Sequence, residues 1–544
     1  MRKGTIFFGV ALAWGFILAF VLGLVMPTAA QGKEPVVLKA WALTYPEPVE
    51  IWRVLSDDLR ELGIQVKLRN GSIGEWVGDI IRKENPYHLV TMTWSGSPER
   101  IEPSWFLTEF FHSSRIERGR NYGNYVSKKF DALMKTQLRE MDPEKRKQLL
   151  WKAQEIINRD NAFFPIYHHD MIQAYNCDRI EGVIPTMGSC IGWPYNPWTF
   201  FRARPKGKIR EPRVVNRKDL MSTNPFAAQE AQTMGWMRLI YDTFAKRDKD
   251  SKLIPWAAES WNIVDDTTVD IVLRDGMRFH DGKLVTVEDA KFTFDYIMKW
   301  KFPMFSADWR NIEHVEIRDG RTLRFKLKSP YAPFVANILL NTFIIPKHIW
   351  KDIPSSVGVA NPMDWPNPTP IGSGPYQLVE WKKKEYFHLK ANKNHFIKPN
   401  FDGLYYLVVP TTEGMIAMLE KQQAEIYGFA LDAVQANKLD ALPYLKTVRV
   451  PNHSITEIRP NFKMRPTSDP SFRRAFQYAI NRKGLLDIVY QGQGVVAHNT
   501  PIIPINKPWS NPNVPSIKFD LGKATQILKE AGYTWDSKGR LCYP

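Results

Sequence analysis

The stretch from Pro255 to Asp289 constrains the fold more than any other part of the chain. An apolar segment, Trp256 to Trp261, is followed by the alternating run Thr268 to Leu273, which predicts a strand with one buried face. Asp and Gly residues between and after these segments predict turns. Thr286, followed by Glu288 and Asp289, predicts the capped start of a helix. The residues alone therefore predict a hairpin followed by a capped helix.

The length and charge of the chain limit the class of protein. A chain of 544 residues exceeds a single hydrophobic core, so two or more lobes are expected. Its 44% hydrophobic and 24% charged residues are typical of a soluble globular protein. The net charge of +17 favours contact with anionic surfaces such as lipid headgroups, or a solvated basic surface. Nucleic acid is not an expected partner, because no basic run with interleaved aromatics occurs.

The N-terminus predicts export. Met1-Arg2-Lys3 precedes an apolar run from Ile6 to Met26, and the small residues Thr28-Ala29-Ala30 follow it. This pattern is typical of a signal peptide over residues 1–30, cleaved before Gln31. No cysteine stands directly after the run, where a lipoprotein would carry one, which favours a free periplasmic protein. The run is also long enough to span a bilayer, so an uncleaved inner-membrane anchor is the alternative.

The chain has three cysteines, Cys177, Cys190 and Cys542. Outside the cytoplasm Cys177 and Cys190 could form a disulfide and leave Cys542 free, or all could be unpaired thiols. Their spacing has no metal-site signature. The adjacent His168 and His169 are not expected to share a metal ion, because neighbouring residues on an extended segment point to opposite faces. We therefore expect no metal and no cofactor.

The stretch from Pro255 to Asp289 resembles the signature of the extracytoplasmic solute-binding proteins of ABC importers, family 5, the oligopeptide/dipeptide/nickel-binding type. In order, it contains recognisable counterparts of the family's AeSW, F.LR, FhDG and tAeD elements. Further segments resemble the same family over residues 35–544. They are Met221 to Pro225, Ile240 to Phe244, Phe343 to His348, Gly372 to Tyr376, Arg473 to Arg482 and Ala524 to Tyr533.

The order of these segments is rotated relative to the family. Residues before about 205 resemble the family's C-terminal half, in Leu62 to Val66, Trp76, Trp94 to Gly96 and Asn121 to Tyr125. The segments that resemble the family's N-terminal half begin after a linker at residues 206–212. The sequence thus resembles a circular permutant in which Pro544 continues, in space, into Pro35. A fusion of two partial genes and a swapped dimer are the alternatives to one closed monomer.

The resemblance implies an α/β fold of the two-lobed periplasmic-binding-protein type II, with a hinge and an interlobe ligand cleft. Carried over, residues 35–170 and 459–544 form lobe 2, and residues 213–458 form lobe 1. Residues 171–205 are the return segment to lobe 1, and 206–212 are the linker. The two crossings between the lobes are then expected near Arg459-Pro460-Asn461 and near His168-His169-Asp170.

The resemblance implies a receptor, not an enzyme. Such a protein captures an oligopeptide-like solute by closing its lobes and delivers it to the membrane subunits of an ABC permease. The motifs of known catalytic sites are missing from the sequence, and the Gly372 to Tyr376 loop lacks the lysine and helix of a phosphate cradle. His280-Asp281 belongs to a turn motif and receives no chemical role. A membrane-anchored sensor or scaffold is the alternative function.

The family's dipeptide ligands imply where to look for a ligand site. Dipeptide-type relatives hold the ammonium with an Asp after the lobe 2 tryptophan and the carboxylate with an Arg after the first lobe 2 strand. Here Ser97 stands in place of the Asp, and Glu47 stands near the Arg position, with Tyr45 beside it. Both departures weaken the free-dipeptide hypothesis, because a buried uncompensated terminus is costly.

Other residues of the same loops supply the remaining candidates. Arg100 is predicted to meet a carboxylate or phosphate, and Glu99 or Glu102 an ammonium, unless these charges are solvated. Trp94 and Tyr122 are predicted to be aromatics that line the cleft. Longer peptides, oligosaccharides, opine-like compounds and nickel chelates are alternative ligands.

Overall fold

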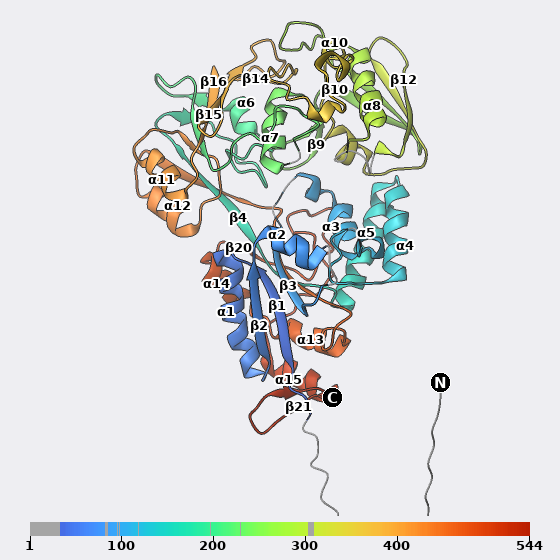
Figure 1. Cartoon of the computed structure of the whole chain (residues 1–544), viewed down its shortest axis with the longest axis vertical. Helices are drawn as coiled ribbons and strands as arrows, with labels where there is room; N and C mark the ends of the chain where they lie inside the picture. The colour runs from blue at the N-terminus through green and yellow to red at the C-terminus, as the bar shows by residue number, and fades with distance from the viewer. Residues whose placement is uncertain are drawn as a thin grey trace, which may run out of the picture.

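The computed structural model describes residues 33–544 except 82–84, 95, 97, 118, 196, 229 and 303–308. The expected signal segment, residues 1–30, lies outside the described residues. In the described part of the chain, no helix combines the length and apolar character needed to cross a membrane. Two lobes lie one above the other, and strand β4 (Phe164–Asn176) runs from one into the other (Figure 1). This arrangement confirms the expected two-lobed α/β architecture.

Lobe 2 is built on the lower end of a mixed sheet with the strand order β4-β19-β3-β1-β2. Strand β1 pairs in parallel with β2 and β3, whereas β19 is antiparallel to both β3 and β4. Strand β20 pairs with β4 in the same sheet, and the helices of this lobe surround the sheet. The bounds are β1 Val37–Leu43, β2 Gln65–Gly71, β3 Leu89–Trp94, β19 Ile455–Pro460, β20 Gly494–Val496, α1 Pro46–Glu61, α2 Ile73–Trp76, α3 Pro103–Phe111, α4 Lys128–Arg139, α5 Pro143–Arg159, α13 Pro470–Tyr478, α14 Arg482–Tyr490 and α15 Leu521–Glu530.

Helix α1 shows why these segments pack as they do. Ile51, Trp52, Leu55 and Leu59 recur at helical spacing and are all buried, so the helix has one continuous apolar face. That face joins the core formed by β1, β4, α13 and α15. A proline in the first turn and an acidic residue beside it favour the helix start.

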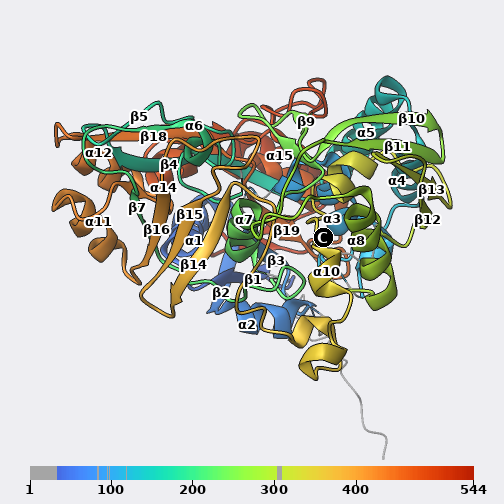
Figure 2. The same ribbon diagram turned by 90° about the horizontal axis from the view of Figure 1, so that it is seen from above.

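Lobe 1 continues the same sheet beyond β4 through β17, β7, β16, β15 and β14. Seen from above, a second sheet, β10-β11-β13-β12, lies at one end of the lobe, and α11, α12 and β18 lie at the other (Figure 2). The bounds are β7 Arg213–Asn216, β8 Ala245–Arg247, β9 Leu253–Pro255, β10 Ala258–Asp265, β11 Thr268–Leu273, β12 Ile312–Ile317, β13 Thr322–Leu327, β14 Tyr376–Lys382, β15 Tyr386–Ala391, β16 Gly403–Val408, β17 Ile426–Tyr427, β18 Leu445–Pro451, α6 Trp198–Arg202, α7 Ala231–Ile240, α8 Val287–Trp300, α10 Lys347–Trp350, α11 Thr412–Glu420 and α12 Ala433–Asp440.

The predicted hairpin and capped helix are confirmed. Strands β10 and β11 pair antiparallel, and Val269 and Ile271 are buried on one face. The Thr286 side chain accepts a hydrogen bond from the Asp289 amide, and the Asp289 carboxylate accepts one from the Thr286 amide. This reciprocal cap satisfies two backbone donors that the first turn of α8 leaves without helical partners.

The chain crosses between the lobes at two places. Strand β4 pairs with β19 through residues 164–167 and with β18 through residues 170–176, so its middle belongs to both lobes. The second crossing is the segment 452–454 between β18 and β19. It precedes the expected position at Arg459-Pro460-Asn461, because Ile455 is already paired with Trp94 in the lobe 2 sheet.

The two ends of the described chain meet at the lower end of lobe 2 (Figure 1). The Val36 amide donates to the Leu541 carbonyl over 2.7 Å, and the Tyr543 amide donates to the Glu34 carbonyl over 3.1 Å. Leu541 belongs to β22 (Leu541–Cys542), which pairs with β21 (Thr534–Trp535). Its amide also donates to the Gly63 carbonyl, and its side chain is buried.

All three cysteines are free thiols, so the alternative of a Cys177–Cys190 disulfide is wrong. The Cys190 thiol is buried and donates to the Val448 carbonyl over 3.3 Å. Cys177 is partly exposed and lies against the Pro443 carbonyl. Each thiol therefore has its own backbone acceptor.

Candidate functional site

Trp94 and Tyr122, the predicted cleft aromatics, converge on a buried carboxylate of lobe 2. The Trp94 indole N–H and the Tyr122 hydroxyl both donate to Glu457 Oε1, over 3.2 and 3.1 Å. Arg459 donates to both oxygens of Glu457 and to the Phe110 carbonyl. All of these side chains are at least nine-tenths buried. The two aromatics thus belong to a polar network in the lobe 2 core.

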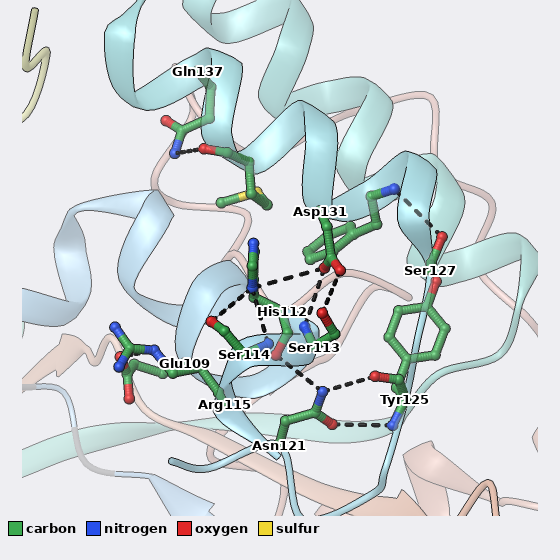
Figure 3. Close-up of polar contacts among 12 residues, drawn as sticks. Glu109, His112, Ser113, Ser114, Arg115, Asn121, Tyr125, Ser127, Asp131 and Gln137 are labelled. Atoms are coloured by element: carbon green, nitrogen blue, oxygen red, sulfur yellow. Dashed lines mark hydrogen bonds and ion pairs between the residues drawn. The ribbon is translucent and has the colours of Figure 1, made fainter. Parts of the chain in front are cut away.

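A loop held by its own side chains presents Tyr122 to this network. The Asn121 side chain donates to the Tyr125 carbonyl and accepts from the Tyr125 amide, and its amide group also reaches the His112 carbonyl (Figure 3). Asp131 accepts from the amide and hydroxyl of Ser113 at the other end of the same loop. The Asn-Tyr-Gly-Asn-Tyr segment therefore has a structural function in this chain.

The charged loop candidates divide between two places. Arg100 lies over the rings of Trp105 and Trp94, at 4.9 and 5.7 Å from the ring centroids. Glu102 is 3% exposed, forms an ion pair with Arg146 and caps α3 through the Ser104 amide. Ser97 lies outside the described residues. Of these, Glu102 lines the larger interlobe cavity described below.

Glu47 lies in the first turn of α1, at the lobe 2 end of the crossing strands. Its Oε1 atom accepts from the hydroxyls of Thr93, Thr456 and Tyr167. Burial and the Glu47 carboxylate raise the pKa of Tyr167 well above its ordinary value, so this hydroxyl stays a donor. Tyr45, next to it, is exposed. The structure does not bring Glu47 and Tyr45 together with Trp94 and Tyr122.

A cavity of about 610 Å³ lies between the lobes. Lobe 2 contributes Ile101, Glu102, Arg146 and Trp509, with neighbours on α5 and the 505–509 segment. Lobe 1 contributes Met187, Arg247, Ser251, Lys252, Ala332 and His453. The lobes touch beside it, where the Ala332 amide donates to the Leu138 carbonyl over 2.9 Å. A ligand held here would be in contact with both lobes.

A second, smaller cavity of about 10 Å³ adjoins the first. The two share the lining residues Ile101, Met187, Arg247, Ser251 and His453, so they lie side by side. A cavity of this volume is about the smallest that holds one water molecule. Its walls include Gly96 of lobe 2 and Gly188, Tyr195, Arg238, Lys246 and Leu340 of lobe 1.

The small cavity is strongly cationic. Arg238, Lys246 and Arg247 are each less than a tenth exposed, and no Asp or Glu occurs among the described residues that line the cavity. Arg238 donates to the Leu340 carbonyl and Asn341 Oδ1, and Arg247 donates to the Ser251 carbonyl. Burial lowers the pKa of Lys246 to about 7 and that of Arg247 to about 10.

Sequence reasoning missed these cations. Lys246 and Arg247 form the end of β8, all of whose residues are buried. The local signal for these buried cations was a pair of basic residues directly after Phe244 and Ala245. In most chains such a pair lies in solvent. Burial comes from α6, α7 and the 187–195 segment, which lie elsewhere in the sequence.

Histidines in the hinge and in lobe 1 should make the fold sensitive to acid. Burial lowers the pKa of both His168 and His280 to about 4, against about 6.5 in an unfolded chain. Between these values only the unfolded chain binds the proton, so stability is lost as the pH falls below about 6.5. We expect a loss of about 1.4 kcal/mol per pH unit for each histidine, measured by urea unfolding from pH 7.5 to 5.

The pH dependence can be assigned with a matched pair of variants. His280→Gln keeps a donor for the Gly374 carbonyl, which His280 Nε2 contacts at 3.0 Å, and removes the titrating ring. The free energy of unfolding of this variant is expected to depend less steeply on pH than that of the wild type. His314→Gln alters an exposed histidine and should keep the wild-type slope. Equal slopes for all three proteins would contradict the assignment to His280.

Comparison with known proteins gives matches over the C-terminal part of the chain. Residues 252–541 match the model of "Bacterial extracellular solute-binding proteins, family 5 Middle". The chain is 30% identical over 333 residues to the oligopeptide-binding protein AppA of Bacillus subtilis, covering 60% of this chain and 59% of the relative. It is 27% identical over 302 residues to the dipeptide-binding protein of Escherichia coli, covering 52% and 55%.

A solved structure matches over a similar extent. It is the periplasmic oligopeptide-binding protein of an oligopeptide ABC transporter from Thermotoga maritima, with a TM-score of 0.49 and 24% identity, covering 61% of this chain and 65% of that chain. The aligned part of the chain thus spans less than two thirds of each of these relatives. In the described part of the chain, no group of three or more His, Cys, Asp or Glu residues is placed to hold a metal ion.

Proposed function

This chain belongs to family 5 of the bacterial extracellular solute-binding proteins, and from that premise we propose that it is the binding receptor of an ABC importer. It captures an oligopeptide-like solute between its lobes and delivers the solute to the membrane permease. The family membership confirms the resemblance drawn from the sequence motifs. The family consists of binding proteins, so no catalytic role is proposed.

The observation that carries this proposal is the 610 Å³ cavity between two lobes that are joined by crossing strands. Closing the lobes around a ligand removes its surface from water, and polar groups on both sides fix its orientation. The ligand binds the closed form in preference to the open one and so raises its population. The permease then recognises the closed form on a monomeric receptor.

Ligand binding should both stabilise and compact the protein. We expect at least one compound among oligopeptides, oligosaccharides, opine-like compounds and metal chelates to raise the melting temperature and lower the radius of gyration measured by X-ray scattering. If no compound in any of these classes raises the melting temperature of the mature chain, that result would count against a receptor function.

A variant that fills the cavity tests where the ligand binds. Ala332 lies at the cavity wall beside the contact with Leu138. Ala332→Trp should abolish the ligand-induced rise in melting temperature, because the indole occupies the space that the ligand needs. The control Val126→Trp changes an exposed position of lobe 2 and should respond to ligand as wild type does. A full response from Ala332→Trp would place the ligand elsewhere.

The N-terminal segment supports a proposal for the compartment in which the protein is located. We propose that the chain is exported and released into the periplasm after cleavage, with an uncleaved anchor and a sensor or scaffold role as the alternative. Sequencing the N-terminus of the protein from the producing cell separates the two. Gln31 as the first residue supports a free receptor, whereas an intact N-terminus in the membrane fraction supports the anchored form.

The order of the chain is also part of the proposal. We propose that the family's pieces occur here in rotated order, with the C-terminal segment completing lobe 2 beside β1. The support is the pairing of Leu541 and Tyr543 with Val36 and Glu34. The rotation leaves the crossing segments uncut, so lobe closure is retained.

A further inference from the structure

The small interlobe cavity brings together positive charges that the protein itself does not fully neutralise. Lys246 Nζ has no hydrogen-bond partner among the described residues, and it lies over the rings of Trp256 and Phe201 at 4.6 and 5.3 Å. Arg247 Nε is likewise without an acceptor in the described structure. A buried ammonium is costly unless an acceptor compensates it.

The acids nearest to these cations are already engaged. Asp242 acts on Lys246 through space, but its carboxylate accepts from the Trp256 indole over 2.7 Å and contacts His395 Nε2 at 3.2 Å. Glu102 and Asp248 both act on Arg247 through their charge. Glu102 is ion-paired with Arg146, and the Asp248 carboxylate accepts from the Asp250 and Lys252 amides. The lowered pKa of Lys246 is the expected consequence of this incomplete compensation.

We propose that the ligand of this receptor carries a terminal oxyanion, a carboxylate or a phosphate, one oxygen of which enters the small cavity and meets Lys246, Arg247 and Arg238. This inference rests on the proposed receptor function and names the chemistry of its ligand. Charged donors such as these form the strongest hydrogen bonds to carboxylate and phosphate oxygens. A neutral oligosaccharide lacks a group that compensates them.

The sizes of the two cavities orient the ligand. The 10 Å³ space beside Lys246 admits a terminal oxygen, and the adjoining 610 Å³ space holds the rest of the molecule. The large cavity carries both signs of charge, with Glu140 and Asp250 as well as Arg146 and Lys252 in its lining. In the small cavity, by contrast, the charged residues among the described lining are all cations.

The proposed site also links anion binding to lobe closure. Arg238, Lys246 and Arg247 belong to lobe 1, whereas Gly96 and Ile101 reach the cavity from lobe 2. Lobe 2 therefore closes over an anion that lobe 1 has bound and shields it from water. Removing water strengthens the attraction between the anion and the cations, so the closed form is the tighter binder.

The test uses pairs of probes that differ only in the terminal charge. Tripeptide acids are compared with their C-terminal amides, and hexose phosphates with the parent hexoses, by thermal shift and calorimetry on the full mature chain. The peptide arm reports a carboxylate source and the sugar arm a phosphate source. We expect the charged member of a pair to bind at least about 10-fold more tightly than the neutral one.

Two variants distinguish the site from the rest of the protein. Lys246→Met replaces the ammonium with an apolar side chain of similar length, and is expected to weaken binding of the charged probe by about 10- to 100-fold. The melting temperature without ligand should stay the same or rise, because a buried charge has been removed. The control Lys249→Met alters an exposed lysine close by in the chain and should bind as wild type does.

The outcomes separate this inference from the proposed function. Preference for charged probes that is lost in Lys246→Met supports the inference, and the arm that responds identifies the anion. Equal binding of charged and neutral probes, or unchanged binding by Lys246→Met, overturns the inference. Either result leaves the proposed receptor function standing. No binding by any probe, including neutral ones, overturns the inference and counts against the receptor as well.

Discussion

Arg459→Leu is expected to lower the free energy of unfolding by about 3–5 kcal/mol. The Arg459 guanidinium is 2% exposed and donates to both carboxylate oxygens of Glu457, which is itself 1% exposed. Its removal leaves a buried carboxylate whose remaining donors among the described residues are Trp94 and Tyr122. The guanidinium also lies over the rings of Phe111 and Tyr122, so cation–π contacts are lost as well.

The measurement is urea unfolding of the mature chain at neutral pH, with two comparisons. The double variant Arg459→Leu with Glu457→Leu should recover most of the loss, because no unpaired charge then remains. Lys483→Met breaks the exposed pair with Asp487 and should cost less than about 1 kcal/mol. A loss below about 1 kcal/mol for Arg459→Leu would show that Glu457 finds other compensation.

Ending the chain at Arg540 is expected to destabilise lobe 2 by more than about 4 kcal/mol. The deletion removes the buried side chain of Leu541 from the core that β1 shares, and with it the buried Cys542. It also removes the backbone bonds from Leu541 to Val36 and Gly63. Gly63 has a φ of +76° and lies so close to Gly539 that a side chain would clash, so this contact is built for close backbone approach.

The truncated chain is compared with Lys538→Ala by urea unfolding. That substitution lies in the exposed 536–540 turn and should change stability by less than about 0.5 kcal/mol. A truncated chain as stable as the full one would mean that the terminal strand adds nothing to the lobe 2 core.

A rotated chain tests the proposed order directly. In this variant a short Gly-Ser linker joins Pro544 to Pro35, and new ends are opened in the 206–212 linker. Because the Val36 amide already bonds to the Leu541 carbonyl, the joint spans a short gap. We expect it to fold and to melt within a few degrees of the original chain. A chain that fails to fold would contradict the rotated order.

Local patterns in the sequence were sufficient for the elements and for the family. The β10–β11 hairpin and the Thr286 cap depend on residues close together in the chain, so turn residues, alternation and capping pairs predicted them. The family motifs likewise span short segments. They predicted the two-lobed architecture and the proximity of the two ends.

The ligand-facing surface depended on tertiary structure. Trp94 and Tyr122 were predicted to line the cleft, but they turn to Glu457, a partner more than three hundred positions away in the chain. Lys246 and Arg247 acquire their burial from segments around Met187, Arg238 and His453. Periodicity records only whether a face is apolar. The packing of distant segments determines which charges are enclosed without a counter-charge. In this protein that packing is set by the way the two lobes meet.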